Sequence, residues 1–226
     1  MKLTTLITMT GFALAATAQA QEETYASSDS WAFFAGGSVG NVYGDFDKTV
    51  GLEGWDSPIY TLQLGMQKKC IDADSSHNSL FLEVGYTDYS TKIIYNTGIV
   101  LGTGVVREDL DMEIVPITLN YKHEFYLSGE MNWYLGAGVG VAQVDTRLSN
   151  SSVPSVVGRS FNDTTLYGHI FAGLNYSYSE AFGVYGGLRY ILMSDVDFSV
   201  LGISSFSDDS PLNSAVQYEF GVRINF

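Results

Sequence analysis

Apolar and polar residues alternate with a period of two along much of the chain, and the alternation is clearest at the C-terminal end. Apolar residues occupy every second position from Val216 to Phe226, and polar or small residues fill the positions between them. Successive side chains of a β-strand point to opposite faces. The pattern therefore predicts a strand with one apolar, aromatic face and one polar or small face.

The same alternation predicts eight strands in all. They cover residues 31–43, 57–68, 79–90, 112–125, 131–144, 164–178, 182–194 and 213–226. The facing of the first is ambiguous, because apolar residues there occur at both odd and even positions. Long polar connections at 44–56, 91–111, 145–163 and 195–212 alternate with short ones at 69–78, 126–130 and 179–181. This alternation is typical of barrels with short periplasmic turns and long extracellular loops.

The first 20 residues have the features of a secretory signal peptide. Lys2 precedes an apolar run, which ends in the small-residue sequence Ala18-Gln19-Ala20. A basic start, a short apolar core and an A-x-A site together predict cleavage and export. We therefore expect a signal peptide at 1–20 and a single domain at 21–226.

Composition narrows the class of exported protein. Charged residues make up 16% of the chain, whereas soluble domains carry about 25%. Beyond residue 20, no apolar stretch approaches the roughly 20 residues of a membrane helix. The net charge of −14 argues against nucleic acid as a partner. These features predict an all-β fold, an eight-stranded antiparallel up-and-down transmembrane β-barrel, which closes because hydrocarbon tolerates no unpaired sheet edge.

These features also carry a family resemblance. With its A-x-A signal, its alternating strands and its terminal sequence YEFGVRINF at 218–226, the chain resembles the small eight-stranded bacterial outer-membrane barrels. It looks most like the opacity-protein and OmpX-like "porin family" barrels and the membrane domain of OmpA. The resemblance implies a protein of the cell outer membrane, in contact with its lipids and lipopolysaccharide. It also implies that Phe226 and Tyr218 belong to the signal that the barrel-assembly machinery reads.

Charged residues on the inward face are the candidate site. At eight strands, side chains roughly fill the interior, where a charge is costly unless it is paired. From their positions along neighbouring strands, we expect Arg189 to lie beside Glu219. The other charges lie nearer the periplasmic ends and are expected to form a second cluster. This second group is Glu83, Lys122, Glu124 and Arg223.

Catalytic and metal-binding motifs have little support. Some eight-stranded barrels modify lipids, but the H-x-S pattern of one such deacylase is missing after His123 and His169, and G-x-S-x-G is missing as well. No histidine pair has zinc-site spacing. The glycines at 136–140 alternate on one strand face, which argues against a nucleotide-binding loop and is explained by inward-facing barrel glycines. We therefore expect no enzyme, cofactor or metal centre.

Two other features are open to ordinary explanations. Cys70, the only cysteine, is expected in a periplasmic turn. Four D-x-D pairs, at 45/47, 72/74, 109/111 and 195/197, could offer oxygens to a divalent cation, although ordinary acidic loop residues are the favoured explanation.

The sequence predicts a structural or surface-interaction role, in adhesion or envelope integrity. The loops would face outward, toward host or envelope ligands, and the lumen would be largely plugged. The alternatives are a narrow pore for small solutes or ions and, third, a lipid-modifying enzyme.

Overall fold

The protein is a closed antiparallel barrel of eight strands, each paired with its neighbours in the chain and the last paired with the first. This computed structural model describes residues 31–44, 55–69, 76–97, 104–151, 160–194 and 214–226. The strands are β1 (Trp31–Gly44), β2 (Trp55–Lys69), β3 (His77–Thr97), β4 (Gly104–Ser128), β5 (Met131–Ser151), β6 (Ser160–Ser177), β7 (Phe182–Met193) and β8 (Ser214–Asn225). The predicted fold class is therefore confirmed. No helix in the described part of the chain is long and apolar enough to cross a membrane.

Three strands are much longer than the alternation predicted. The sequence placed a loop at 91–111, but β3 continues to Thr97 and β4 begins at Gly104. It placed another at 145–163, where β5 continues to Ser151 and β6 begins at Ser160. The predicted strands ended where the apolar face ended. Pairing continues further, because a strand outside the hydrocarbon needs a partner for its backbone but no apolar side chains.

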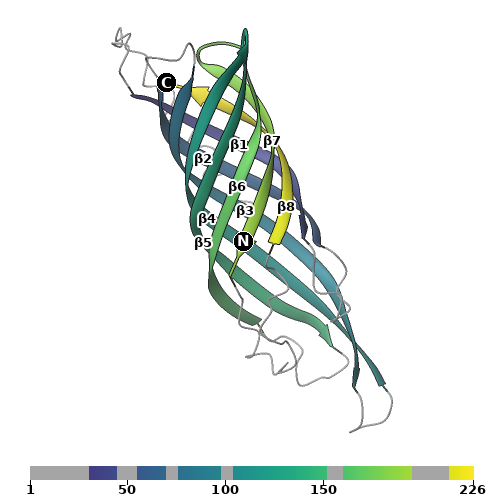
Figure 1. Cartoon of the computed structure of the whole chain (residues 1–226). Coiled ribbons are helices and arrows are strands. Elements are labelled where there is room, and N and C mark those ends of the chain that lie inside the picture. Colours follow the sequence, from purple (N-terminus) through teal and green to yellow (C-terminus); the bar gives the residue numbers. More distant parts are fainter. Residues whose placement is uncertain (1–30, 45–54, 70–75, 98–103, 152–159, 195–213) are drawn as a thin grey trace.

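The two ends of the barrel differ. The tight turns after β4 and β6 lie at the same end as the C-terminus, uppermost in Figure 1, and the β3–β4 hairpin projects from the other end. Gly129 adopts a φ of 54° in the turn between β4 and β5, a conformation that favours glycine. Since short turns are periplasmic in such barrels, the projecting end is the extracellular one.

Register resolves the facing of β1. Phe34, Ser38 and Val42 are buried in the lumen, whereas Phe33 and Val39 lie on the outside and are more than half exposed. Around the ring, aliphatic and aromatic side chains cover the outer face of the barrel. Most of the buried polar side chains point into the lumen. This is the inverse of a soluble barrel, because the solvent of the outer face is hydrocarbon.

Inward-facing glycines make room for large side chains from neighbouring strands. A Cβ at Gly221 would lie 2.5 Å from the hydroxyl of Tyr185. A Cβ at Gly173 would lie at the same distance from the hydroxyl of Tyr134. Each tyrosine therefore lies across the backbone of another strand, in space that a larger residue at the glycine position would occupy.

Candidate functional site

The lumen contains all six charged residues that the sequence placed on the inward face. Each is at least nine-tenths buried, and together they are the buried aspartate, glutamate, lysine and arginine residues of the described chain. They are Glu83, Lys122, Glu124, Arg189, Glu219 and Arg223. Strand parity positions them, because every one occupies an inward position of the closed sheet.

Arg189 is the centre of the first cluster. Its Nη2 donates to both carboxylate oxygens of Glu219, at 3.2 and 3.1 Å, and to Oε2 of Glu83 at 3.0 Å. Its Nη1 pairs with Oε1 of Glu83 and lies 3.3 Å from Nε2 of His169. Gln63 donates to Glu83 at 2.8 Å. Arg189 therefore bridges two carboxylates, within a shell of polar partners.

Glu124 is the centre of the second cluster, nearer the periplasm. Its Oε1 accepts from Lys122 at 2.8 Å and from Arg223 at 2.6 Å. Its Oε2 accepts from Asn175 at 3.2 Å. Here one carboxylate holds two cations, the reverse of the Arg189 cluster.

The expected grouping of Glu83 was wrong. The sequence placed it with Lys122, Glu124 and Arg223, whereas its partner is Arg189. Counting residues from the periplasmic end of each strand neglected the width of the lumen. In the ring of eight strands, β3 lies opposite β7, and the long arginine side chain spans the distance between them.

An aromatic layer separates the two clusters. Phe34, Phe81, Tyr134, Phe171 and Tyr185 form one buried cluster. Cations from both sides lie over its rings. Lys122 Nζ is 5.2 Å from the Tyr134 ring centroid, and Arg189 Cζ is 5.4 Å from that of Phe171. Such contacts are attractive, most of all where water is excluded. The aromatic layer therefore stabilises the buried cations that pack against it.

Apolar side chains line much of the extracellular half of the lumen, together with the small polar side chains of Ser57, Thr87, Thr146 and Thr165. This apolar lining was not predicted from the sequence. The inward apolar residues are almost fully buried and include Val42, Ile59, Tyr89, Met112, Ile114, Val144, Tyr167, Ile191 and Met193. Where both faces of a strand are apolar, the alternation of apolar and polar residues disappears, and the inward face cannot be recognised from that pattern. The available signal was the run of apolar residues at the same parity as the lumen charges.

Comparisons with solved structures agree with this geometry. Neisserial surface protein A (NspA) superimposes with a TM-score of 0.55 at 15% identity, over 86% of this chain and 97% of that one. The chain has the fold of the small outer-membrane β-barrels. This fold agrees with the outer-membrane location that the sequence predicts. The attachment invasion locus protein Ail of Yersinia pestis superimposes with a TM-score of 0.44 at 12% identity, over 87% of this chain and 97% of that one.

The protease OmpT of Escherichia coli gives a TM-score of 0.46 at 10% identity, over 86% of this chain and 97% of that one. No protein-family model and no curated protein sequence matches the chain. The likeness therefore concerns the fold, and the role of this barrel has to be argued from its own residues.

The two residues predicted to belong to an assembly signal, Phe226 and Tyr218, lie on the outer face of the barrel. Phe226 is 41% exposed, and its backbone N–H donates to the carbonyl of Phe33 at 2.9 Å, which ties the C-terminus to β1. The ring of Tyr218 lies 5.8 Å from that of Tyr43. Their part in assembly stays a prediction.

Several other predictions concern residues beyond the described ranges. They are the signal peptide at 1–20, Cys70, and the aspartate pairs at 45/47, 72/74 and 195/197. Of the remaining pair, Asp111 accepts a hydrogen bond from Ser90 at 2.7 Å. In the described part of the chain, no group of three or more histidine, cysteine, aspartate or glutamate residues is arranged to hold a metal ion.

Proposed function

We propose that this barrel is a non-enzymatic surface-interaction protein, which presents the extracellular extension of β3, β4 and β5 to partners and keeps its lumen closed to solutes. The observation that supports the proposal is the length of these strands. A tilted strand needs about 9–11 residues to cross a membrane. β3, β4 and β5 have 21, 25 and 21 residues.

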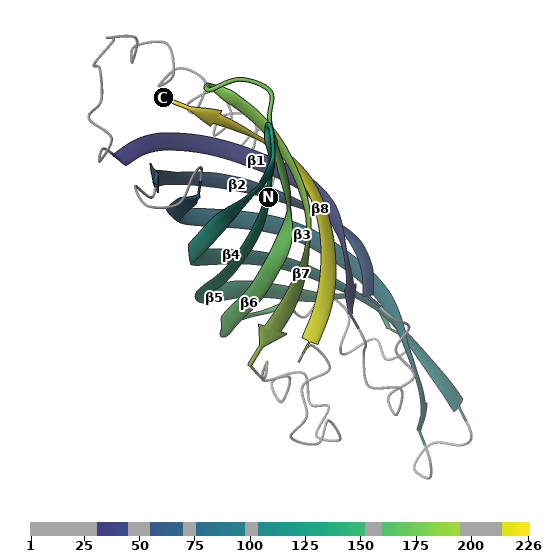
Figure 2. The same cartoon turned by 45° about the horizontal axis from the view of Figure 1, so that its top comes forward.

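The extension is a paired sheet that continues past the barrel wall. β3 and β4 pair without a break from Thr87↔Ile114 out to Thr97↔Gly104, and β4 pairs with β5 as far as Glu108↔Ser151. Figure 2 shows the β3–β4 hairpin reaching beyond the ends of the other strands. A sheet held by two ladders is a firmer platform for recognition than a single connecting loop.

One edge of the extension is free among the described residues. β2 pairs with β3 only up to Ile59↔Thr87, so no described strand pairs with that side of residues 90–97. An unpaired edge offers a row of backbone donors and acceptors to an incoming strand. Extended polypeptide of a host or envelope protein is therefore the partner class that we propose.

The closed lumen ranks this role above the alternative of a narrow pore. Every charge of the lumen is paired within one of two clusters, whose net charges of −1 and +1 cancel. The aromatic layer lies between the clusters, and the extracellular half carries no buried Asp, Glu, Lys or Arg among the described residues. Water and ions entering this path would have to displace packed side chains. The third alternative, an enzyme, would need an accessible catalytic group. His169, the lumen histidine, is 3% exposed and lies against Arg189.

Panning a peptide phage library tests the interaction role directly. The target is the wild-type barrel in lipid nanodiscs, and the counter-target is a variant in which a two-residue Asn-Gly turn replaces residues 91–110. We expect peptides of high β-propensity to be enriched on the wild type alone. Equal enrichment on both, with the variant folded by heat-modifiability on gels, contradicts the proposal.

Single-channel recording tests the closed lumen. Wild-type protein in planar bilayers is expected to show no steady conductance. A large, stable conductance would promote the pore to first place. In the cell, we expect the wall to contact lipid and lipopolysaccharide, and the barrel-assembly machinery to be a partner only during insertion.

A further inference from the structure

A groove crosses the outer wall of the barrel, on the face that contacts lipid. Its floor is a single row of register partners on four neighbouring strands. Gly221 on β8 pairs with Ser38 on β1, Ser38 with Thr61 on β2, and Thr61 with Gly85 on β3. These residues point inward, so the outer surface of the row is backbone. The groove has a volume of about 610 Å³.

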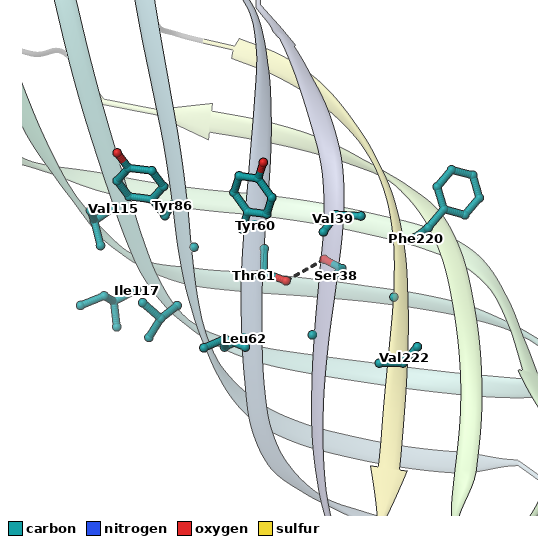
Figure 3. A pocket seen from close by; sticks show the side chains of 14 residues that line it. Ser38, Val39, Tyr60, Thr61, Leu62, Tyr86, Val115, Ile117, Phe220 and Val222 are labelled. Atoms are coloured by element: carbon teal, nitrogen blue, oxygen red, sulfur yellow. Dashed lines mark hydrogen bonds between the residues drawn. The ribbon is translucent and has the colours of Figure 1, made fainter. Parts of the chain in front are cut away.

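Two rows of outward side chains form the walls of the groove. The extracellular wall includes Val39, Tyr60 and Tyr86, and Figure 3 shows both tyrosine rings along this side. The opposite wall includes Leu62 and is interrupted at Gly37, where no side chain stands. The lining is almost wholly apolar, so its occupant must be apolar where it lies in the groove.

The groove slopes across the membrane. On β8 the floor residue, Gly221, is close to the periplasmic end of the strand. On β3 the floor residue, Gly85, is further from that end, because the strands are tilted and staggered. The groove therefore rises toward the extracellular side as it passes from β8 to β4. The hydroxyls of Tyr60 and Tyr86 flank its upper part, where tyrosines in membrane proteins meet lipid headgroups.

The dimensions match one lipid chain. The lining extends from β8 to β4, four strand spacings of about 4.8 Å, or roughly 19 Å. One leaflet of the hydrocarbon core is about 15 Å thick, half of roughly 30 Å. An acyl chain that lies obliquely in the groove spans a comparable length. The groove is also continuous with the lipid-facing belt, so hydrocarbon chains reach it directly.

We propose that this groove binds one acyl chain of lipid A, the lipid anchor of lipopolysaccharide, in the outer leaflet. The headgroup would lie beyond Tyr86, toward the extracellular side. There Asp88 and Glu113 are register partners on β3 and β4, both on the outer face. Carboxylates repel lipid phosphate unless a divalent cation lies between them, and Mg²⁺ bridges carboxylates and phosphates in this way. Binding therefore requires Mg²⁺.

A matched pair of substitutions tests the groove. Gly37→Leu fills it, and a Cβ there would meet only the carbonyl of Thr61 at 3.2 Å and the Leu62 side chain at 3.4 Å. The control is Ala172→Leu, in a depression of about 200 Å³ on the other side of the ring. Both changes add the same side chain to the lipid face. Val84→Phe, which narrows the groove from its wall, is a second groove variant in case Gly37→Leu does not fold.

The measurement is native mass spectrometry of purified barrels mixed with lipid A, or with phosphatidylethanolamine, in detergent containing Mg²⁺. We expect wild type and Ala172→Leu to retain one lipid A, Gly37→Leu and Val84→Phe to retain about tenfold less, and EDTA to release it. Equal retention by groove variants and wild type overturns the proposal, as does equal loss in Ala172→Leu. If the wild type retains phosphatidylethanolamine as well as it retains lipid A, the assignment to lipid A is overturned. If the wild type shows the mass of a dimer and Gly37→Leu does not, the groove binds a second copy of the chain instead.

Discussion

Arg189 on β7 forms an ion pair with Glu83 on β3, directly across the lumen. The second cluster repeats this arrangement, because Arg223 on β8 pairs with Glu124 on β4, again on opposite strands. Backbone ladders connect only neighbouring strands. The two ion pairs therefore add direct links between walls that the hydrogen-bonding pattern leaves unconnected.

Removing the shared cation is expected to be the most damaging change in the lumen. Arg189→Met leaves the buried carboxylates of Glu83 and Glu219 without their cation and should lower the free energy of unfolding by about 3–5 kcal/mol. Glu83→Gln leaves Arg189 with Glu219 and should cost less, about 1–3 kcal/mol. Urea unfolding in phosphatidylcholine vesicles measures both. The triple variant that combines Arg189→Met, Glu83→Gln and Glu219→Gln should be more stable than Arg189→Met alone. An unchanged urea midpoint for Arg189→Met would refute this account.

Gly221 and Tyr185 are expected to be energetically coupled. In Gly221→Ala the new methyl group meets the tyrosine ring, and the overpacking should cost about 1–3 kcal/mol. Tyr185→Leu removes that ring, so Gly221→Ala should cost much less stability in the Tyr185→Leu background than in the wild type. A double-mutant cycle by urea unfolding measures the coupling. Additive costs would show that the ring moves aside without strain.

Charge on the outer wall should be costly according to depth. Val139, 59% exposed, lies midway along the membrane part of β5. Val139→Arg is expected to lose about 2–4 kcal/mol, because the arginine would face hydrocarbon. The control is Leu127→Arg, which lies on β4 beside the periplasmic turn and should lose about 0–1 kcal/mol. Folding yield and urea unfolding in vesicles test the difference. Equal losses at the two positions would contradict the membrane placement.

The terminal residue is expected to act in the cell more than in the purified barrel. Deleting Phe226 removes an outward aromatic side chain and one backbone hydrogen bond to Phe33. Outer-membrane levels should fall strongly if the barrel-assembly machinery reads this residue, while refolding in detergent should change little. Phe226→Tyr keeps an aromatic terminus and serves as the control. Normal levels after deletion would count against an assembly signal.

The sequence predicted the fold because hydrocarbon imposes a simple rule. Strands inside the membrane need one apolar face, so the alternation located all eight and assigned the six lumen charges to the inside. Outside the membrane the rule does not apply, and there the predicted strand boundaries were wrong. Residues 91–97 lie beyond the membrane, lack the alternation and still form part of β3.

The pairing inside the lumen was only partly predictable, for a geometric reason. Arg189 and Glu219 are on adjacent strands, where Arg189 pairs in register with Gln217 and Glu219 lies at the next inward position. The contact between Arg189 and Glu83 depends on the diameter and stagger of the closed ring, which no local pattern records. The groove on the outer wall has the same origin, because its floor joins residues of four strands that only register aligns.

The distribution of the lumen charges has a consequence for assembly. The first four strands contribute Glu83, Lys122 and Glu124, a net charge of −1, and the last four contribute Arg189, Glu219 and Arg223, a net charge of +1. Half a barrel in a bilayer would therefore carry an uncompensated charge as well as two open edges. Only the complete ring is neutral within, so the two halves are electrostatic complements that gain most by entering the membrane together.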